Sequence, residues 1–382
     1  MKTILSFIDW YLPGYRAGGT LKAFANQIAQ LEGVYNFRII TRDTDYCETT
    51  PYDGVRSNEW TRLTENSEVY YMSADALGHK QMKKLVRETV YDAVYVHGIY
   101  SYWFSILPVY LAKKAKASPI VVCAHGMLGR HALDVKNTKK QLFLKLAKYF
   151  GLFRNVVFHA ANEAEAADVI HALGKKAKVV VAEELPMKAD LSQRDGITKK
   201  EGKLRMCSFA RISPEKNTKY ALEVLMYCKD HDIVYDIHGP VYNESYWQEC
   251  LQVIAKLPSN IKVEYKGSLP GDQVFDKLKE YHLMFMPTTG ENFGHIILES
   301  LMAARPVIIS NNTPWRGLTG KKAGYDLPLD KMQAFVQAVE HFAGMIQQDY
   351  DDLSLGAIEH ARAFIANNDI LQQNINLFRD EG

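Results

Sequence analysis

The chain has 382 residues, of which 47% are hydrophobic and 24% are charged, so it is long enough for two globular domains and differs in composition from disordered proteins. Its 46 basic and 44 acidic residues leave a formal net charge of +2, which gives nucleic acid no general support as a partner. No apolar run approaches the roughly 20 residues that span a bilayer.

Short apolar segments bounded by turn residues alternate with longer amphipathic segments along the chain. This alternation predicts an α/β fold, with parallel sheets covered by helices. The predicted strands of the first half are 3–9, 37–41, 93–96, 120–124, 156–160 and 179–182. Those of the second half are 204–209, 234–238, 262–265, 283–286 and 307–310.

The polar, lysine-rich segment 184–203 has no apolar periodicity and contains one Pro and two Gly, so it predicts a linker. We therefore expect two doubly wound, Rossmann-like domains, at 1–190 and 191–382. Whether the final helix packs back on the N-terminal domain is left open. The five cysteines have no C-x-x-C spacing, which favours reduced thiols in the cytoplasm and argues against a zinc site.

The segment PTTGENFGHIILESLMAARPVIIS, residues 287–310, predicts a strand end, a turn, a helix and a second strand. Backbone N–H groups at a helix start that follows a strand form a binding crevice for phosphates and sugar hydroxyls. Glu291 in the turn and Glu299, two turns into the helix, can each accept hydrogen bonds from different parts of one elongated ligand. The alternative is that Glu291 caps the helix and Glu299 is a solvated surface residue.

This Glu-x7-Glu pattern, in the setting P-[ST]-x-x-E-x-F-G, resembles the donor-site motif of retaining glycosyltransferases of the GT-B fold, the group 1 family. The resemblance implies two Rossmann-like domains that face each other across a cleft. It implies that Glu291 contacts the donor sugar, that Glu299 binds the nucleotide ribose, and that the backbone of Phe293 and Gly294 lies against the sugar and diphosphate. Asn292 belongs to the same predicted donor loop.

Arg211 and Lys216 fit the family pattern G-R-x-x-x-x-K-[NG], with Ala210 in place of the Gly. The resemblance implies that these two cations stabilise the departing nucleoside diphosphate. Without that context they would be ordinary surface charges. Ala304 also replaces a usual family Gly, which we interpret as a packing difference.

Three glycine loops match loops that border the nucleotide in the family. Gly239 ends the segment IHG, and Gly267 lies in EYKGSLPG, which packs on the base in the family. Gly18 and Gly19 lie between the first strand and an amphipathic helix, where small residues let the backbone approach a diphosphate. A tight turn without a ligand is the alternative for this pair.

His125 follows a predicted strand, and the run AHGMLGRHAL resembles the acceptor-side histidine loop of the family. Its imidazole could hydrogen-bond a sugar hydroxyl or help to position the acceptor, so we count it with Glu291, Lys216 and Arg211 as a catalytic residue. His97 ends another strand, and for this residue a structural role is favoured.

The segment 136–154 predicts a lysine-rich amphipathic helix, which could lie on an anionic membrane or simply pack on its own domain.

The resemblance implies a retaining glycosyltransferase that moves a hexosyl-type sugar from a nucleotide diphospho-sugar to a glycan or lipid-linked acceptor. We expect a role in surface polysaccharide or lipopolysaccharide biosynthesis in the cytoplasm, at the inner face of the cell membrane. No cofactor is expected. We assign no Asp-x-Asp motif to a strand end, so metal-independent activity is expected too. The alternatives are a nucleotide-sugar epimerase of the same fold and a non-catalytic nucleotide-sugar-binding subunit.

Overall fold

The computed structural model describes residues 1–129, 137–192 and 194–379. They form two compact units. Unit 1 comprises Met1–Lys188 and the C-terminal segment from Asn367, and unit 2 comprises Ala189–Ala366. Unit 2 therefore begins two residues before the predicted boundary at 191, and the last helix belongs to unit 1.

Unit 1 contains an eight-stranded sheet in the order β3-β4-β2-β1-β5-β6-β7-β8. Neighbouring strands are parallel except for the edge strand β3, which is antiparallel to β4. The strands are β1 Lys2–Phe7, β2 Tyr35–Arg42, β3 Trp60–Thr64, β4 Ser67–Met72, β5 Ala93–His97, β6 Ile120–Cys123, β7 Val157–Ala160 and β8 Lys178–Val181. The strand order reverses between β1 and β5, so the loops after these two strands border the usual ligand crevice of such a sheet.

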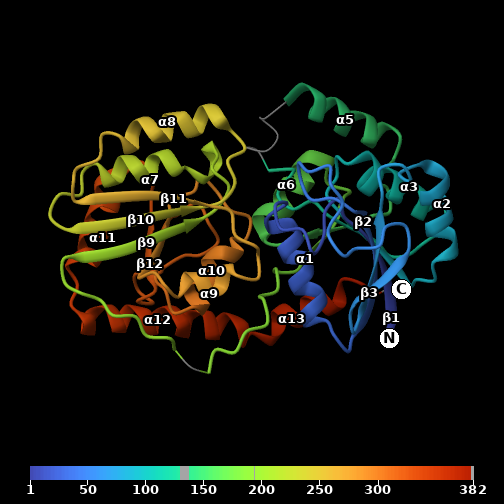
Figure 1. Ribbon diagram of the computed structural model, residues 1–382. Helices are drawn as coiled ribbons and strands as arrows, with labels where there is room; N and C mark the ends of the chain where they lie inside the picture. Colours follow the sequence, from blue (N-terminus) through green and yellow to red (C-terminus); the bar gives the residue numbers. More distant parts are fainter. Residues whose placement is uncertain (130–136, 193, 380–382) are drawn as a thin grey trace. The chain divides into compact units, whose positions relative to one another are not determined.

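The helices of unit 1 cover the buried faces of this sheet (Figure 1). They are α1 Gly19–Gln30, α2 His79–Glu88, α3 Leu107–Lys114, α5 Asn137–Tyr149, α6 Glu163–Leu173 and α13 Asn368–Asn376, with a π-helical turn η1 at Tyr102–Ile106. In α1 the apolar residues Leu21, Phe24 and Ile28 recur at helical spacing and are buried, which explains why this segment forms a helix against the sheet.

The C-terminal segment is fixed to unit 1 by aromatic packing and hydrogen bonds. The ring of Phe378, which follows α13, lies 5.4 Å from that of Tyr35 and 5.1 Å from that of Tyr95, measured between ring centroids. Gln27 Nε2 on α1 donates to Asn374 Oδ1 on α13 at 2.9 Å. The last helix therefore completes the core of unit 1, although it follows unit 2 in sequence.

Unit 2 contains a six-stranded parallel sheet in the order β11-β10-β9-β12-β13-β14. The strands are β9 Lys203–Phe209, β10 Asp232–His238, β11 Ile261–Gly267, β12 Leu283–Met286, β13 Val307–Ser310 and β14 Gly324–Leu327. The helices are α7 Thr218–Leu225, α8 Glu244–Ile254, α9 Val274–Leu278, α10 His295–Met302, α11 Met332–Gly344 and α12 Gln347–Ile365, with a 3-10 turn η2 at Pro214–Lys216.

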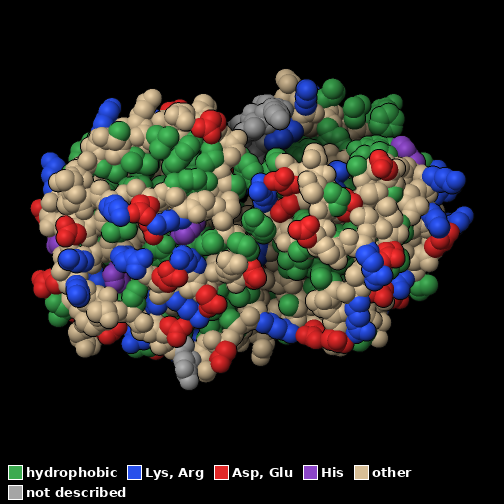
Figure 2. Space-filling model, in the orientation of Figure 1, with side chains coloured by type: hydrophobic (Ala, Val, Ile, Leu, Met, Phe, Trp, Pro, Cys, Tyr) green, Lys and Arg blue, Asp and Glu red, His purple; other side chains and the backbone are tan. Residues whose placement is uncertain are grey.

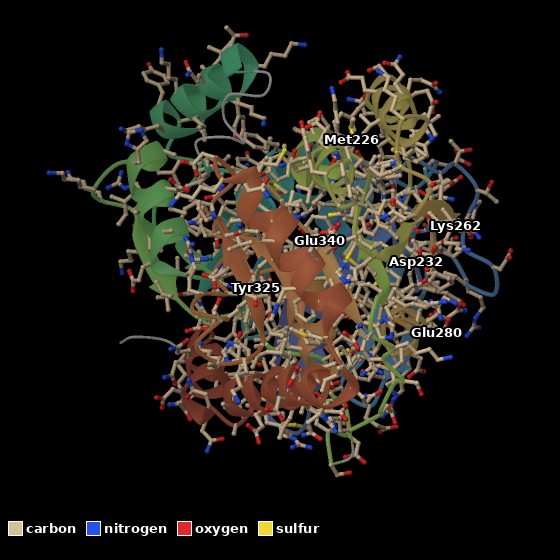
Figure 3. All side chains as sticks on the ribbon, turned by 90° about the vertical axis from the view of Figure 1, so that its left-hand side faces the viewer. Met226, Asp232, Lys262, Glu280, Tyr325 and Glu340 are labelled. Atoms are coloured by element: carbon tan, nitrogen blue, oxygen red, sulfur yellow. The ribbon has the colours of Figure 1, made fainter. Side chains whose placement is uncertain are left out.

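Helices α7 and α8 pack together on one side of the sheet, and α9, α10 and α12 lie on the other (Figure 1). The strand order reverses between β9 and β12. Asp232 and Lys262, at the amino-terminal ends of β10 and β11, face the viewer in Figure 3, so the carboxyl-terminal loops lie at the opposite edge of the sheet.

The segment that begins unit 2 is held by two arginines of the same unit. Arg305 is 1% exposed and donates to the carbonyl oxygens of Asp195 at 2.9 Å and Lys279 at 2.7 Å. Arg362 on α12 donates to the carbonyl oxygen of Leu191 at 3.0 Å. These bonds attach Leu191 and Asp195, which lie in the predicted linker, to the rest of unit 2.

The two parallel sheets confirm the predicted α/β fold. Three strands were not predicted, namely β3, β4 and β14. The lysine-rich helix α5 ends at Tyr149, earlier than the predicted residue 154. Its predicted first residue, Lys136, lies outside the described residues.

Candidate functional site

The loops that follow β9 and β12 meet at the carboxyl edge of the unit 2 sheet. Lys216 ends the loop after β9, and Glu291 lies in the loop after β12. Lys216 Nζ donates to Glu291 Oε1 at 2.6 Å, and the two side chains are only 19% and 11% exposed. Since β9 and β12 flank the point at which the strand order reverses, this ion pair lies where doubly wound sheets bind ligands.

A second set of hydrogen bonds joins the same two loops. The carbonyl oxygen of Glu215 accepts from the Thr289 N–H at 2.9 Å and from the hydroxyls of Thr288 and Thr289, each at 3.0 Å. Asn217 Nδ2 donates to the carbonyl oxygen of Pro287 at 3.0 Å. Lys216 is thus held between two anchored residues, and its ammonium group is positioned before any ligand arrives.

A ligand of matching chemistry can separate Lys216 and Glu291 and become the new partner of each. Partly buried ion pairs have lost much of their hydration, so their net contribution to stability is small. Phosphate oxygens can take the place of the carboxylate at Lys216, and hydroxyl groups can take the place of the ammonium at Glu291. A sugar phosphate offers both kinds of group.

Glu299 is buried within α10. This helix begins at His295 after Gly294, which has a φ of 84° and provides no side-chain cap. Glu291 therefore does not cap the helix, which removes one alternative reading of the motif. Glu299 is the fifth residue of α10, so it lies one turn into the helix and not two as predicted, and it is 2% exposed, which rules out a solvated surface residue.

The loop before α10 is held by Trp315, which sequence reasoning did not single out. Phe293 is 6% exposed, and its ring centroid lies 5.6 Å from that of Trp315 and 4.8 Å from that of His295. Trp315 Nε1 donates to the carbonyl oxygen of Phe293 at 2.7 Å. Phe293 is therefore a core residue that fixes the loop, while its neighbour Asn292 is partly exposed. The only sequence signal for this bond is the indole that follows the turn NNTP.

The loops after β10 and β11 extend the same edge. A Cβ atom at Gly239 would lie 1.9 Å from the carbonyl oxygen of Ala210, so only glycine allows this close approach of the two loops. The Gly239 N–H donates to the carbonyl oxygen of Gly267 at 2.9 Å. Gly267 itself has a φ of 73° and an open Cβ position. Arg211 lies beside this junction, about half exposed, with a guanidinium nitrogen 3.8 Å from the Glu215 carboxylate.

Unit 1 carries a separate set of predicted residues at the carboxyl edge of its own sheet. Gly18 precedes α1 with a φ of 77°, and a Cβ atom at Gly18 or Gly19 would meet nothing within 4 Å. The backbone at the start of α1 is therefore open to a ligand. A tight turn without a ligand is equally compatible with this geometry.

His125 follows β6 in a conformation that non-glycine residues rarely adopt, with a φ of 48°. The next residue is held by Glu165, whose Oε1 accepts from the Gly126 N–H at 2.6 Å. Nδ1 of His97 lies 2.9 Å from Nε2 of His125. Burial and the neighbouring His125 lower the pKa of His97 well below its usual range, so His97 is neutral.

The sequence matches the models of two known protein families. Residues 190–343 match the family described as Glycosyl transferases group 1, and residues 20–156 match the one described as Glycosyl transferase 4-like. The chain belongs to the group 1 glycosyltransferases. No curated protein gave a significant match to the sequence.

Solved structures resemble this glycosyltransferase over its whole length. Sucrose-phosphate synthase from Thermosynechococcus elongatus is 13% identical, with a TM-score of 0.71, over 99% of this chain and 98% of that chain. HepE of Anabaena, in complex with UDP and glucose, is 15% identical, with a TM-score of 0.67, over 98% and 97%. WaaG, described as a glycosyltransferase involved in lipopolysaccharide biosynthesis, is 12% identical, with a TM-score of 0.62, over the full length of both chains. These likenesses establish the GT-B fold, with two Rossmann-like domains.

One expectation about this glycosyltransferase was wrong. The sequence does contain an Asp-x-Asp motif at a strand end, because Asp43 and Asp45 follow β2. Both carboxylates are used within unit 1: Asp43 Oδ2 accepts from Ser57 Oγ at 2.8 Å, and Asp45 Oδ2 accepts from the Tyr15 N–H at 3.0 Å. Within the described part of the chain, no group of three or more His, Cys, Asp or Glu residues is arranged to hold a metal ion. The five cysteines are unbridged.

Proposed function

We propose that this group 1 glycosyltransferase transfers a hexosyl-type sugar from a nucleotide diphospho-sugar to a glycan or lipid-linked acceptor, with retention at the anomeric carbon. The observation that carries the proposal is the Lys216–Glu291 pair at the strand-order reversal of unit 2. It presents one cation and one carboxylate, side by side and largely shielded from water, to a ligand that binds at this edge.

Each side chain of the site has a proposed role. Lys216 and Arg211 bind the diphosphate, Glu291 accepts hydrogen bonds from sugar hydroxyls, and Glu299 accepts them from the ribose. The open Cβ position of Gly267 leaves room for the nucleotide against the backbone, and Gly239 lets its own loop lie close to Ala210 at the same edge. HepE is described in complex with UDP-glucose, and TarM of Staphylococcus aureus in complex with UDP, so uridine diphosphate is the first nucleotide to test.

The chemistry follows from these charges. The bond from the anomeric carbon to the diphosphate oxygen breaks while the acceptor hydroxyl bonds to the same face of the sugar, and the acceptor's proton passes to a diphosphate oxygen. Negative charge grows on the diphosphate as that bond breaks, and the ammonium of Lys216 is already in place to stabilise it. This fixed cation supports metal-independent transfer.

The acceptor side of the proposal involves the membrane surface. Helix α5 carries a stripe of exposed apolar side chains at helical spacing, which continues just past its end: Leu142, Leu146, Tyr149 and Phe150, exposed by 58%, 46%, 83% and 75%. Lys139, Lys145 and Lys148 are exposed beside this stripe. Figure 2 shows hydrophobic and basic side chains together over α5.

Such a stripe suits a helix that lies in the headgroup region of an anionic bilayer. The opposite side of α5 is buried through Leu144 and Ala147, so the exposed stripe is additional to the face that packs on unit 1. Among the described residues no helix is long and apolar enough to cross a bilayer. We therefore propose that the protein acts at the inner face of the cell membrane. WaaG is described as involved in lipopolysaccharide biosynthesis, which supports the proposal of a role in surface polysaccharide or lipopolysaccharide biosynthesis.

A thermal-shift panel of UDP-, GDP-, ADP- and TDP-sugars tests the donor assignment. Transfer is then measured with the sugar that stabilises the protein, with and without a membrane extract as the source of acceptor. Acceptor-dependent release of nucleoside diphosphate supports a transferase. Acceptor-independent conversion of the sugar identifies an epimerase, binding without turnover identifies a non-catalytic subunit, and no stabilisation by any donor contradicts the proposal.

A further inference from the structure

His97 and His125 form a histidine pair at the carboxyl edge of the unit 1 sheet. His97 is the last residue of β5, and His125 comes two residues after the end of the adjacent strand β6. Nδ1 of His97 lies 2.9 Å from Nε2 of His125, and the two rings meet edge to edge, with centroids 5.2 Å apart and an interplanar angle of 22°. One of these nitrogens must donate and the other must accept.

The surroundings of His97 decide which nitrogen donates. The residue is 3% exposed and packs between the rings of Phe24, at 4.0 Å, and Tyr95, at 4.2 Å. Its Nε2 is buried, with no hydrogen-bond partner among the described residues. A proton on Nε2 would therefore be a buried donor without an acceptor, a rare and costly arrangement. A proton on Nδ1 is used in the bond to His125.

The backbone of His125 is also held in one conformation. Its φ of 48° lies in the left-handed region, which non-glycine residues rarely adopt. The two carboxylate oxygens of Glu165 hold the adjacent chain, accepting from the Gly126 N–H at 2.6 Å and from the Ala161 N–H at 2.8 Å. Backbone strain that the surroundings maintain in this way is typical of functional residues.

We propose that His97 is a positioning residue that fixes the tautomer of His125. His97 donates its Nδ1–H to Nε2 of His125, so the proton of the neutral His125 ring lies on Nδ1. In this state His125 is a hydrogen-bond donor to an oxygen atom of a substrate and not a general base. The inference deepens the proposed function, since it assigns the chemistry of one of its residues.

Imidazole ¹⁵N spectra of the full-length protein test the tautomer without any assay of activity. The His125 signals are those lost in His125→Gln. In the wild type we expect Nδ1 of His125 to resonate as a protonated nitrogen and Nε2 as a bare one. A proton on Nε2 of His125 would overturn the proposal.

Two substitutions of His97 separate the hydrogen bond from the packing. The amide nitrogen of Asn lies at the same number of bonds from Cβ as Nδ1 of His, so His97→Asn keeps the donor, and His97→Leu removes it. We expect the Nδ1–H tautomer of His125 to persist in the Asn variant and to give way to Nε2–H in the Leu variant. His159→Leu removes another buried histidine of the same ring stack and should leave His125 unchanged. An unaltered tautomer in His97→Leu would also overturn the proposal.

Kinetics connect the tautomer to transfer. His97→Leu should lower kcat by about 10-fold to 100-fold, the range known for residues that orient metal-binding histidines through a hydrogen bond, and His97→Asn should recover most of it. The KM of the donor and that of the acceptor show which substrate supplies the oxygen. If the wild type turns over no nucleotide sugar, the proposed function fails while the spectra still decide the tautomer.

Discussion

The ammonium group of Lys216 lies 2.6 Å from the carboxylate of Glu291, although 75 residues separate the two in sequence. The parallel sheet brings them together, because β9 and β12 are neighbours and their carboxyl-terminal loops share hydrogen bonds through the carbonyl of Glu215. Each partner stabilises the other in the absence of substrate, and each has a different group to bind when a sugar diphosphate arrives.

Replacing Lys216 by Ala should lower turnover much more than it weakens donor binding. The ammonium interacts most strongly with charge that develops on the leaving diphosphate, so its loss should reduce kcat by about 100-fold to 1,000-fold. Steady-state kinetics with calorimetric measurement of donor affinity would check this. Lys219→Ala is the matched control, since Lys219 lies three residues after Lys216 and forms a more exposed ion pair, with Glu249. A kcat equal to that of the control would contradict the role of Lys216.

Replacing Glu299 by Gln should weaken nucleotide binding. The substitution keeps the side-chain volume in a site that is 2% exposed but removes the charge, which should cost about 1–3 kcal/mol of binding free energy. Isothermal titration with the nucleoside diphosphate measures this cost. Glu249→Gln changes an exposed carboxylate of the same unit and should leave the affinity unchanged. If both variants bound nucleotide like the wild type, Glu299 would not contact the ribose.

Replacing Trp315 by Phe should loosen the donor loop. The variant keeps the ring packing on Phe293 but removes the Nε1–H donor, leaving a buried carbonyl without that partner, at a cost of about 1–3 kcal/mol in the free energy of unfolding. The KM for the donor should rise as well, since the loop begins α10. Denaturant unfolding and donor kinetics measure the two effects, with Trp60→Phe in the edge strand β3 as the control. Unchanged stability and KM would show that the hydrogen bond is dispensable.

Replacing Ala304 by Gly should stabilise unit 2. Ala304 has a φ of 57°, a left-handed conformation that glycine adopts without strain, and the gain should be about 1 kcal/mol after the greater chain entropy of glycine is subtracted. The neighbouring Ala303 has a φ of −75°, so Ala303→Gly should instead destabilise. Urea unfolding of the two variants checks the opposite signs. A loss of stability in both would show that packing of the Ala304 methyl outweighs the backbone strain.

The α5 stripe predicts binding to anionic vesicles. Replacing Leu142, Leu146 and Phe150 together by Glu should abolish sedimentation with vesicles that contain phosphatidylglycerol. Raising the salt concentration should weaken wild-type binding, because each of the three exposed lysines contributes about 1 kcal/mol through charge attraction. Leu251→Glu alters an exposed leucine on α8 of unit 2 and should bind like the wild type. Failure of the wild type to bind would remove the membrane from the proposal.

The fold could be predicted where strands are buried on both faces. β12 is a short apolar run and β13 is apolar except for its last residue, Ser310, and the predicted bounds of both agree with the structure. β3 was missed because its sequence WTRLT is half polar and lies at an exposed sheet edge, and β14 because its four residues include a Gly and an Asp. The assignment of α13 to unit 1 depends on contacts such as that of Phe378 with Tyr95, which leave no local pattern in the sequence.

The candidate site was predictable in its residue types but not in its pairings. The motif predicted Glu291 and Glu299, and the resemblance predicted Lys216. The Lys216–Glu291 ion pair and the hydrogen bonds to the carbonyl of Glu215 could be predicted only from the order of the strands in the sheet. Asp43 and Asp45 show the opposite error, since a motif present in the sequence was overlooked, and its carboxylates proved to hold the Tyr15 and Ser57 loops. The roles of the site residues stay predictions.

The most direct test of the donor site is a calorimetric titration of the variant Lys216→Met, Glu299→Gln with the nucleoside diphosphate that the wild type binds. We predict that the wild type gives a saturable isotherm and that the double variant binds clearly more weakly, since the ribose loses the carboxylate of Glu299 and the phosphates keep only Arg211 of their two cations. An isotherm of wild-type affinity in the double variant would show that the nucleotide binds elsewhere.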